Sequence, residues 1–256
     1  MPDSALLKME AMTTAFSSAL NATQRPMWLN FHCLGPWAPW CAAQGNSWRI
    51  GPDHHDSWES LSEVLLVLGS AAKHGGPYRW TDPDFLMTGG AGCDDFTPGL
   101  QCPGMTPVEY KTEFTLWSIA AASMLVATDV RALSPLQQEI LLNKELLAVV
   151  QDPSPEAGGL AYRPAVPLHS EVWARTLADG SVAVGLFNRG NTTSTISVDF
   201  SRLALPGCGG EGYAASTCKA AVRDLWAHAD RGVAEGHYAS AVEGHGTVAL
   251  RLTPQR

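Results

Sequence analysis

Residues Asn46–Trp58 read Asn-Ser-Trp-Arg-Ile-Gly-Pro-Asp-His-His-Asp-Ser-Trp, and the fold of the first half of the chain is predicted outward from them. The stretch begins as a short buried strand, breaks at Gly51-Pro52 and presents Asp53 just before a run with helical periodicity. A polar residue at the carboxyl end of a strand is where a β/α fold places its chemistry. The competing interpretation is an ordinary strand–loop–helix corner in which Asp56 caps the helix.

Helices and strands alternate on both sides of this stretch. Gly35–Gly45, rich in Pro and Trp, is expected to be a loop. Strands are predicted near Met27–Cys33, Ser47–Ile50, Trp80–Met87 and Met124–Ala127, and helices over Ala5–Leu20, Asp56–Ala72, Pro107–Ala120 and Ser134–Asn143. This alternation predicts an α/β fold with parallel strands.

The pattern changes after Gln151-Asp152-Pro153. Short β-branched runs separated by Gly, Asn and Asp turns predict an antiparallel β domain. The expected strands are Glu171–Arg175, Val182–Asn188, Thr195–Asp199, Ala220–Leu225 and Thr247–Leu252. We therefore expect one domain over residues 1–155 and a second over 156–256. The second offers no convergent catalytic group, because His228, His237 and His245 are scattered.

Composition and charge exclude several classes of function. The net charge of −8 and the scattered basic residues argue against a nucleic-acid partner. The longest apolar run, Leu116–Val130, is too short and too rich in Ala and Ser to span a membrane. The adjacent pair His54-His55 is not expected to hold a metal, because neighbouring residues seldom converge on one ion.

Six cysteines form three local pairs without Cys-x-x-Cys spacing. We expect disulfides Cys33–Cys41, Cys93–Cys102 and Cys208–Cys218, each closing a short loop. Asn21-Ala-Thr and Asn191-Thr-Thr are acceptor motifs for N-glycosylation. Together these features predict an oxidising, secretory-route compartment. Because no signal peptide is visible at Met1, the chain is expected to begin inside a longer protein.

Several motifs resemble glycoside hydrolase family 27, the α-galactosidase (melibiase) family. They occur in the family's order along nearly the whole chain. The matching segments are Asn46-Ser-Trp-Arg with Asp53 and Asp56-Ser-Trp58, Trp80-Thr-Asp-Pro-Asp84-Phe-Leu-Met, Phe114-Thr-Leu-Trp-Ser-Ile-Ala, Ala127-Thr-Asp-Val-Arg131, Val149-Val-Gln-Asp-Pro153, Ala19-Leu20-Asn-Ala-Thr-Gln-Arg-Pro26, Val222-Arg-Asp-Leu-Trp226 and His245-Gly-Thr-Val-Ala-Leu. The resemblance implies strands five to eight of a (β/α)8 TIM barrel, followed by an antiparallel all-β sandwich.

The resemblance also implies a retaining hydrolase of α-galactosides that needs no metal or cofactor. Such enzymes use two carboxylates about 5–5.5 Å apart. Asp53 takes the position of the general acid/base, whose pKa the nucleophile's charge and partial burial would raise. Arg49 corresponds to an arginine that binds the sugar near its 2-position, and Asp84 to an aspartate close to the sugar. Leu34 and Gly35 fall in the substrate-binding loop.

Two departures from the family pattern stand out. No Lys-Tyr-Asp nucleophile motif is present, since Lys8-Met9-Glu10 lies within a helical pattern. The nucleophile is therefore expected to be missing from this chain, together with the first half of the barrel. The second departure is Leu34, because many members have a glutamate that reads the sugar 2-hydroxyl at that position.

Three hypotheses follow from the sequence. The first is an α-galactosidase whose upstream half is not in this sequence. The second is a truncated, non-catalytic protein that binds sugar or a partner. The third is a member with another specificity, such as an α-N-acetylgalactosaminidase or a β-L-arabinopyranosidase. As given, the chain is expected to lack hydrolytic activity and to self-associate through open strand edges, with a homodimer as one form. A secreted or lysosomal/vacuolar location is expected.

Overall fold

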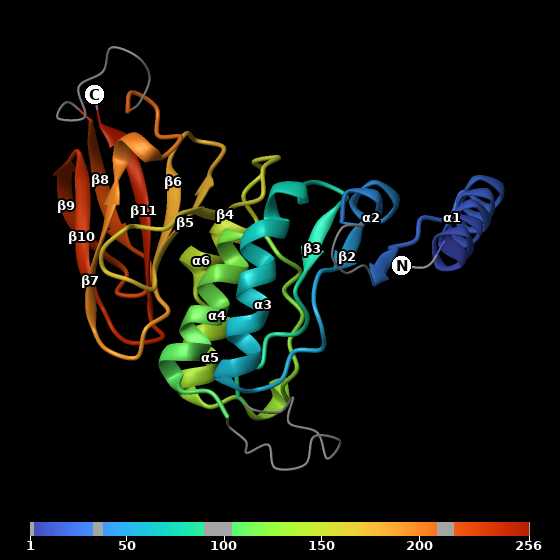
Figure 1. Ribbon diagram of the computed structural model, residues 1–256, viewed down its shortest axis with the longest axis horizontal. Helices are drawn as coiled ribbons and strands as arrows, with labels where there is room; N and C mark the ends of the chain where they lie inside the picture. The colour runs from blue at the N-terminus through green and yellow to red at the C-terminus, as the bar shows by residue number, and fades with distance from the viewer. Residues whose placement is uncertain (1–2, 33–37, 90–103, 209–217, 256) are drawn as a thin grey trace.

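The computed structural model describes residues 3–32, 38–89, 104–208 and 218–255. In Figure 1 a helix-rich part holds the parallel strands, and a β-sandwich lies at the other end of the molecule. The elements of the first part are α1 (Asp3–Thr23), β1 (Asn30–His32), α2 (Ala38–Gln44), β2 (Ser47–Arg49), α3 (Trp58–Ala71), η2 (Ala72–His74), β3 (Trp80–Asp82), α4 (Pro107–Ile119), η3 (Val130–Ala132), α5 (Pro135–Leu141) and α6 (Lys144–Val150).

The parallel sheet has the strand order β1-β2-β3. His32, Arg49 and Asp82, the last residues of the three strands, are register partners. The fourth predicted strand is reduced to one parallel bridge between Leu86 and Val126. The prediction of parallel strands alternating with helices is confirmed, and it places the carboxyl ends of the strands at one edge.

The segment between β1 and β2 corrects one prediction, because Ala38–Gln44 forms helix α2 instead of a loop. A proline in the first turn does not prevent a helix, since that N–H would have no partner within the helix anyway. Cys41 in α2 is fully buried and disulfide-bonded. Its expected partner, Cys33, lies outside the described residues.

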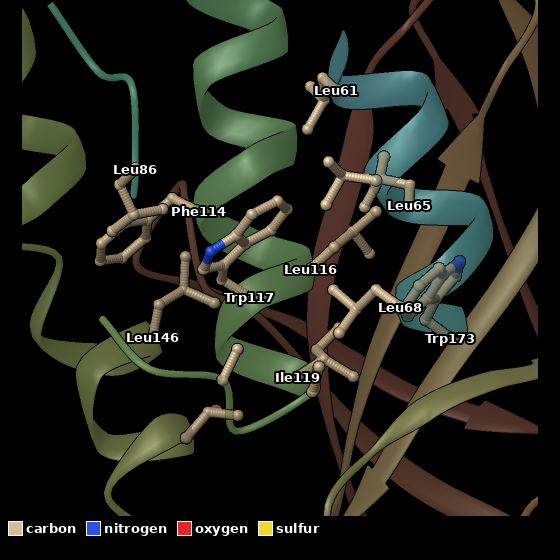
Figure 2. Close-up of a cluster of buried hydrophobic side chains, with 14 of the residues drawn as sticks. Leu61, Leu65, Leu68, Leu86, Phe114, Leu116, Trp117, Ile119, Leu146 and Trp173 are labelled. Carbon is tan, nitrogen blue, oxygen red and sulfur yellow. The ribbon is translucent and has the colours of Figure 1, made fainter. Parts of the chain in front are cut away.

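Helices α3 and α4 pack together between the parallel strands and the sandwich (Figure 1). Ser57 caps α3, and Thr106 with Glu109 forms a capping box on α4. Leu61, Leu65 and Leu68 of α3 point toward Leu116 and Ile119 of α4 in Figure 2. Helix α4 is buried along most of its length, as expected for a helix enclosed on all sides.

The second part is an antiparallel β-sandwich. Its six-stranded sheet has the order β4-β5-β6-β11-β8-β9, and β10 pairs with β7 in a second sheet. The bounds are β4 (Gly159–Tyr162), β5 (Ser170–Thr176), β6 (Val182–Asn188), β7 (Ser194–Asp199), η4 (Phe200–Arg202), β8 (Lys219–Asp224), β9 (Ala229–Glu235), β10 (His237–Val242) and β11 (Thr247–Gln255). All five strands predicted here are present. Strands β4, β9 and β10 were not predicted, and β9 is a largely exposed edge strand with no apolar alternation.

The two parts share one core. Trp173 and Phe187 of the sandwich belong to the same buried cluster as Leu65 and Trp117 of the helical part. The connection between them is held by Arg175, which is fully buried and donates hydrogen bonds to the main-chain oxygens of Val149, Val150, Asp152, Ser154 and Glu156. The domain boundary at residues 155/156 stays a prediction.

His245 joins the sandwich to the start of α3. Its ring stacks on Trp58 with the centroids 3.7 Å apart and an interplanar angle of 7°. Its two ring nitrogens contact Glu109 and Asn191. His228 also contacts the helical part, because its Nδ1 lies 2.8 Å from Oε1 of Glu145 in α6. Two of the three scattered histidines are therefore structural contacts between the two parts.

Candidate active site

The candidate site lies at the carboxyl edge of the parallel sheet, and Arg49 is at its centre. The Nη2 atom of Arg49 lies 2.7 Å from Asp84 Oδ2 and 3.2 Å from Asp53 Oδ1. The same atom donates to the main-chain oxygen of Pro52 at 3.0 Å. Three residues that the sequence predicted for the site are thus brought together by one guanidinium group.

Asp53 is the exposed member of this group, with 77% of its side chain accessible. The sequence led us to expect partial burial, and that expectation is wrong for this structure. The reason is local, because Asp53 sits in the loop that follows the strand break at Gly51-Pro52, and among the described residues its ion pair is with Arg49.

Asp84 is the buried member of this group. Its φ of +86° lies in the left-handed region, which residues other than glycine adopt infrequently. Its N–H donates to Asp82 Oδ1 at 3.0 Å, and its main-chain oxygen accepts from the Trp117 indole at 3.3 Å. Its carboxylate accepts the N–H groups of His54 and Phe85. These contacts hold the strained conformation in place.

Two further residues are connected to this group and were not assigned from the sequence: Asp82 at the carboxyl end of β3 and Asn30 at the amino end of β1. The amide of Asn30, at the start of β1, donates to Asp82 Oδ2 at 2.5 Å. Asp82 lies within the Trp80-Thr-Asp-Pro-Asp84 motif, so its position was visible in the sequence. Asn30 lies in the apolar run Met27–Cys33, and the only signal in the sequence was that it is one of the few polar residues of that run.

Below the site, a buried polar network supports the loop that carries Asp53. The His54 ring contacts Ser60 Oγ and Glu113 Oε1, each at 2.9 Å. Burial raises the pKa of Glu113, and the hydrogen bond from His54 opposes that rise. With His54 engaged in this way, the part of the chain that the structure describes holds no cluster of three His, Cys, Asp or Glu side chains suited to a metal ion.

The competing interpretation of this stretch is wrong on one point, because Asp56 does not cap α3. Ser57 is the cap, and its side chain accepts the N–H of Ser60. Asp56 is fully buried and accepts hydrogen bonds from the N–H groups of Gly104 and Met105 and from the Tyr110 hydroxyl. Burial and the charge of Asp56 raise the pKa of Tyr110, so its hydroxyl remains a donor. Asp56 therefore fastens the loop to α4.

A cavity of about 680 Å³ lies at the amino-terminal ends of the parallel strands. Its lining includes Trp28, Asn30, Ser47, Trp80 and Leu125, and it does not include Asp53, Arg49 or Asp84. Asn30 is the connection between the two regions, since it lines the cavity and also contacts Asp82 at the edge. The group around Arg49 thus lies outside this cavity.

Family comparisons agree with this arrangement over both parts of the chain. Residues 4–152 match the family described as alpha galactosidase A, and residues 169–252 match the alpha galactosidase C-terminal beta sandwich domain. The chain belongs to the alpha-galactosidase family. The fold predicted from the sequence, barrel strands followed by an antiparallel sandwich, is that of the family's solved structures.

Alpha-galactosidase relatives are similar to this chain over most of its length. The alpha-galactosidase of Cyamopsis tetragonoloba is 31% identical over 240 residues, covering 93% of this chain and 52% of that protein. The alpha-N-acetylgalactosaminidase of Rattus norvegicus is 33% identical over 68% of this chain and 41% of its own length. The chain thus spans about half the length of the curated relatives it matches.

Among solved structures, a GH27 β-L-arabinopyranosidase of Geobacillus stearothermophilus, in complex with arabinose, has the same fold. Its TM-score to this alpha-galactosidase family member is 0.81, with 25% identity over 95% of this chain and 54% of that chain. The substrate-loop residues Leu34 and Gly35 lie outside the described residues. The departure at Leu34 therefore remains a prediction about specificity.

The disulfide predictions divide in the same way. Cys208–Cys218 is present, with 4.9 Å between the two Cα atoms, and this prediction is confirmed. The pair Cys93–Cys102 lies outside the described residues. No helix in the described ranges is long and apolar enough to cross a membrane.

Proposed function

We propose that this chain supplies the acid/base side of the active site of a retaining glycoside hydrolase acting on terminal α-linked galactose. Asp53 is the general acid/base, and Arg49 and Asp84 bind hydroxyl groups of the sugar. The observation that carries the proposal is the convergence of Asp53 and Asp84 on the Nη2 atom of Arg49 at the carboxyl edge of the sheet.

Each residue has a chemical task that its environment suits. Asp53, exposed at the rim, protonates the leaving oxygen and then deprotonates the water that releases the sugar. A carboxylate has about four acceptor positions. Asp84 uses three of them for Arg49, His54 and Phe85, so one position is left for a sugar hydroxyl.

The nucleophile is proposed to come from outside this sequence. A retaining mechanism needs a second carboxylate that faces the anomeric carbon from the opposite side. Asp84, the other carboxylate on Arg49, is buried and holds three donors, which suits binding better than attack. The family resemblance places the nucleophile on an earlier barrel strand, which agrees with the chain matching half of each relative.

Two alternatives concern the substrate. A relative named alpha-N-acetylgalactosaminidase and a structure named as a β-L-arabinopyranosidase support a site for a related pyranoside. A sugar-binding protein without hydrolysis is the remaining alternative, supported by Arg49 and Asp84 being held in place independently of Asp53.

Two further proposals concern the protein's setting. A secreted or lysosomal/vacuolar location is supported by the Cys208–Cys218 disulfide, since such bonds persist in oxidising compartments. A homodimer is supported by β1, which ends the described sheet and leaves one strand edge open. Analytical ultracentrifugation of the purified chain tests the second proposal.

The test of function is a chromogenic assay with an aryl α-galactoside. The 256-residue chain alone is expected to show no turnover. Supplying an upstream segment with the nucleophile strand should produce turnover that Asp53→Asn slows by about 10²–10⁴-fold with poor leaving groups. Asp230→Asn is the control, because Asp230 is also an exposed carboxylate paired with an arginine, on the sandwich.

Turnover by the 256-residue chain alone, lost in Asp53→Asn, would place the nucleophile within this sequence and refute that part of the proposal. Turnover of the completed enzyme that is unchanged in Asp53→Asn would refute the acid/base assignment itself.

A further inference from the structure

Glu113 on α4 is a fully buried carboxylate that contacts two separate loops of the candidate site. Its Oε1 atom lies 2.9 Å from Nε2 of His54, in the loop after β2. Both of its oxygens accept the N–H of Met87, after β3, at 3.0 and 3.1 Å. One side chain therefore connects the two loops.

Each loop carries a residue of the proposed sugar site close to its contact with Glu113. His54 directly follows Asp53, and its own N–H donates to Asp84 Oδ2 at 2.9 Å. Met87 lies three residues after Asp84. Helix α4 also supplies Trp117, whose indole donates to the main-chain oxygen of Asp84 and whose ring centroid is 5.9 Å from that of His54. Helix α4 therefore contacts Asp84 directly, and it contacts the loop of Asp53 through His54.

A packing role alone does not account for a glutamate at this position. Burying a carboxylate costs several kcal/mol unless hydrogen bonds and charges compensate. An apolar side chain of similar volume would fill the same space without that cost. What it could not supply is the pair of hydrogen bonds to His54 and Met87, which join the loops.

We propose that Glu113 is a positioning residue that holds the loops of residues 51–57 and 82–87 in register, so that Asp53, Arg49 and Asp84 face one sugar ring. The inference rests on the proposed function for its sugar, but the connection between the loops stands on the contacts alone.

Glu109, one turn earlier on α4, is a matched control. It is also buried and also pairs with a histidine, since its Oε1 lies 2.6 Å from Nδ1 of His245. Its other contact is with the N–H of Thr106 in the capping box. Replacing it therefore disturbs the start of α4 and the contact with the sandwich without removing a hydrogen bond to either site loop.

The test compares Glu113→Leu, Glu113→Gln, His54→Phe and Glu109→Leu in the full chain. Amide hydrogen exchange is measured for peptides covering residues 51–57 and 82–89, and galactose affinity is measured by titration. Glu113→Leu should speed exchange in both loops and weaken galactose binding by roughly tenfold, the effect of losing one buried hydrogen-bond partner. Glu113→Gln should stay close to wild type, because its amide can accept from Met87 and donate to His54 Nε2.

His54→Phe gives a second test if Glu113→Leu fails to fold. It keeps an aromatic ring beside Trp117 and removes the hydrogen bond to Glu113. Faster exchange in residues 82–89, on the other loop, is the expected result. Glu109→Leu should leave both loops protected and galactose affinity within about twofold, a change of a few tenths of a kcal/mol.

Equal effects of Glu113→Leu and Glu109→Leu on both loops would overturn the proposal, as would unchanged exchange in residues 82–89 in His54→Phe. Loosened loops with unchanged galactose affinity would also overturn it. Absence of galactose binding in the wild type would count against the proposed function, and hydrogen exchange would still decide whether Glu113 joins the loops.

Discussion

Two arginines, Arg49 at the strand edge and Arg175 at the connection to the sandwich, are arranged in different ways. Arg175 uses all three of its guanidinium nitrogens on main-chain oxygens of the turn around residues 149–156. Arg49 uses Nη2 alone, and its buried Nε has no hydrogen-bond partner in the described structure. Buried polar groups usually have a hydrogen-bond partner. Arg175, all of whose guanidinium nitrogens donate hydrogen bonds, is therefore a structural arginine, whereas Arg49 has a buried donor without a partner among the described residues.

The two arginines also differ in the carboxylates around them. Among the described residues no carboxylate lies within hydrogen-bond distance of Arg175, and burial lowers its pKa, although Asp152 partly offsets this. Arg49 holds two carboxylates on one nitrogen, one exposed and one buried. Arg175 therefore contributes to folding, whereas the group around Arg49 keeps one exposed carboxylate and is the sugar site that we propose.

The largest expected effect is on Arg175. Arg175→Met should lower the free energy of unfolding by about 3–5 kcal/mol, because five main-chain oxygens lose a donor in a buried site. Arg175→Lys should recover little, since an ammonium group cannot reproduce the planar fork. Urea denaturation measures both. A loss of unfolding free energy below about 1 kcal/mol, the size of one ordinary hydrogen bond, would show that Arg175 is not a structural arginine.

Arg49→Met should reduce galactose affinity more than it reduces the free energy of unfolding. Galactose affinity should fall by about 100-fold, since charged hydrogen bonds to a ligand are worth about 1.5–3 kcal/mol. The free energy of unfolding should fall by less than for Arg175→Met. Titration and urea denaturation on the same samples give both quantities. Unchanged affinity with a large loss of stability would make Arg49 a structural residue as well.

Glu113 is buried like Arg175 but contacts the loops of the proposed site. The pH dependence of its contribution to stability extends the comparison. Because burial raises its pKa in the folded state, its protonated form is favoured by folding. That contribution is present below the ordinary value near 4.5 and is lost as the pH rises through the raised pKa. Glu113→Gln should therefore gain stability relative to wild type as the pH rises above 4.5. Urea midpoints of both proteins at several pH values test this, and a constant difference would contradict it.

The smallest expected effect on stability is at Asp53. Asp53→Asn should change the free energy of unfolding by no more than about 0.5 kcal/mol, because an exposed ion pair contributes little. The measurement is again urea denaturation, with Asp230→Asn alongside. A loss of about 2 kcal/mol or more, equal to at least two ordinary hydrogen bonds, would show that Asp53 supports the fold.

Sequence reasoning worked best where one local pattern decides the outcome. The helical periodicity after Asp53 was enough to predict α3, whose buried face holds Leu61, Val64, Leu65 and Leu68. It failed at Ala38–Gln44, where Pro and Trp suggested a loop and burial of Cys41 favoured a helix. It also failed at β9, whose exposed edge position removes the alternation that identifies a strand.

For the site, the sequence by itself determined the residue types and their order: Arg49 and Asp53 after one strand, Asp84 after the next. It did so because the alternation of strands and loops can be recognised in the sequence, and it places these residues at the ends of two successive strands. Only the tertiary structure decided that both carboxylates meet on one nitrogen of Arg49, that Asp56 is buried against Tyr110, and that Glu113 joins the two loops. These contacts cross up to 59 positions of the chain, so they depend on how α4 packs against the sheet and not on any local pattern.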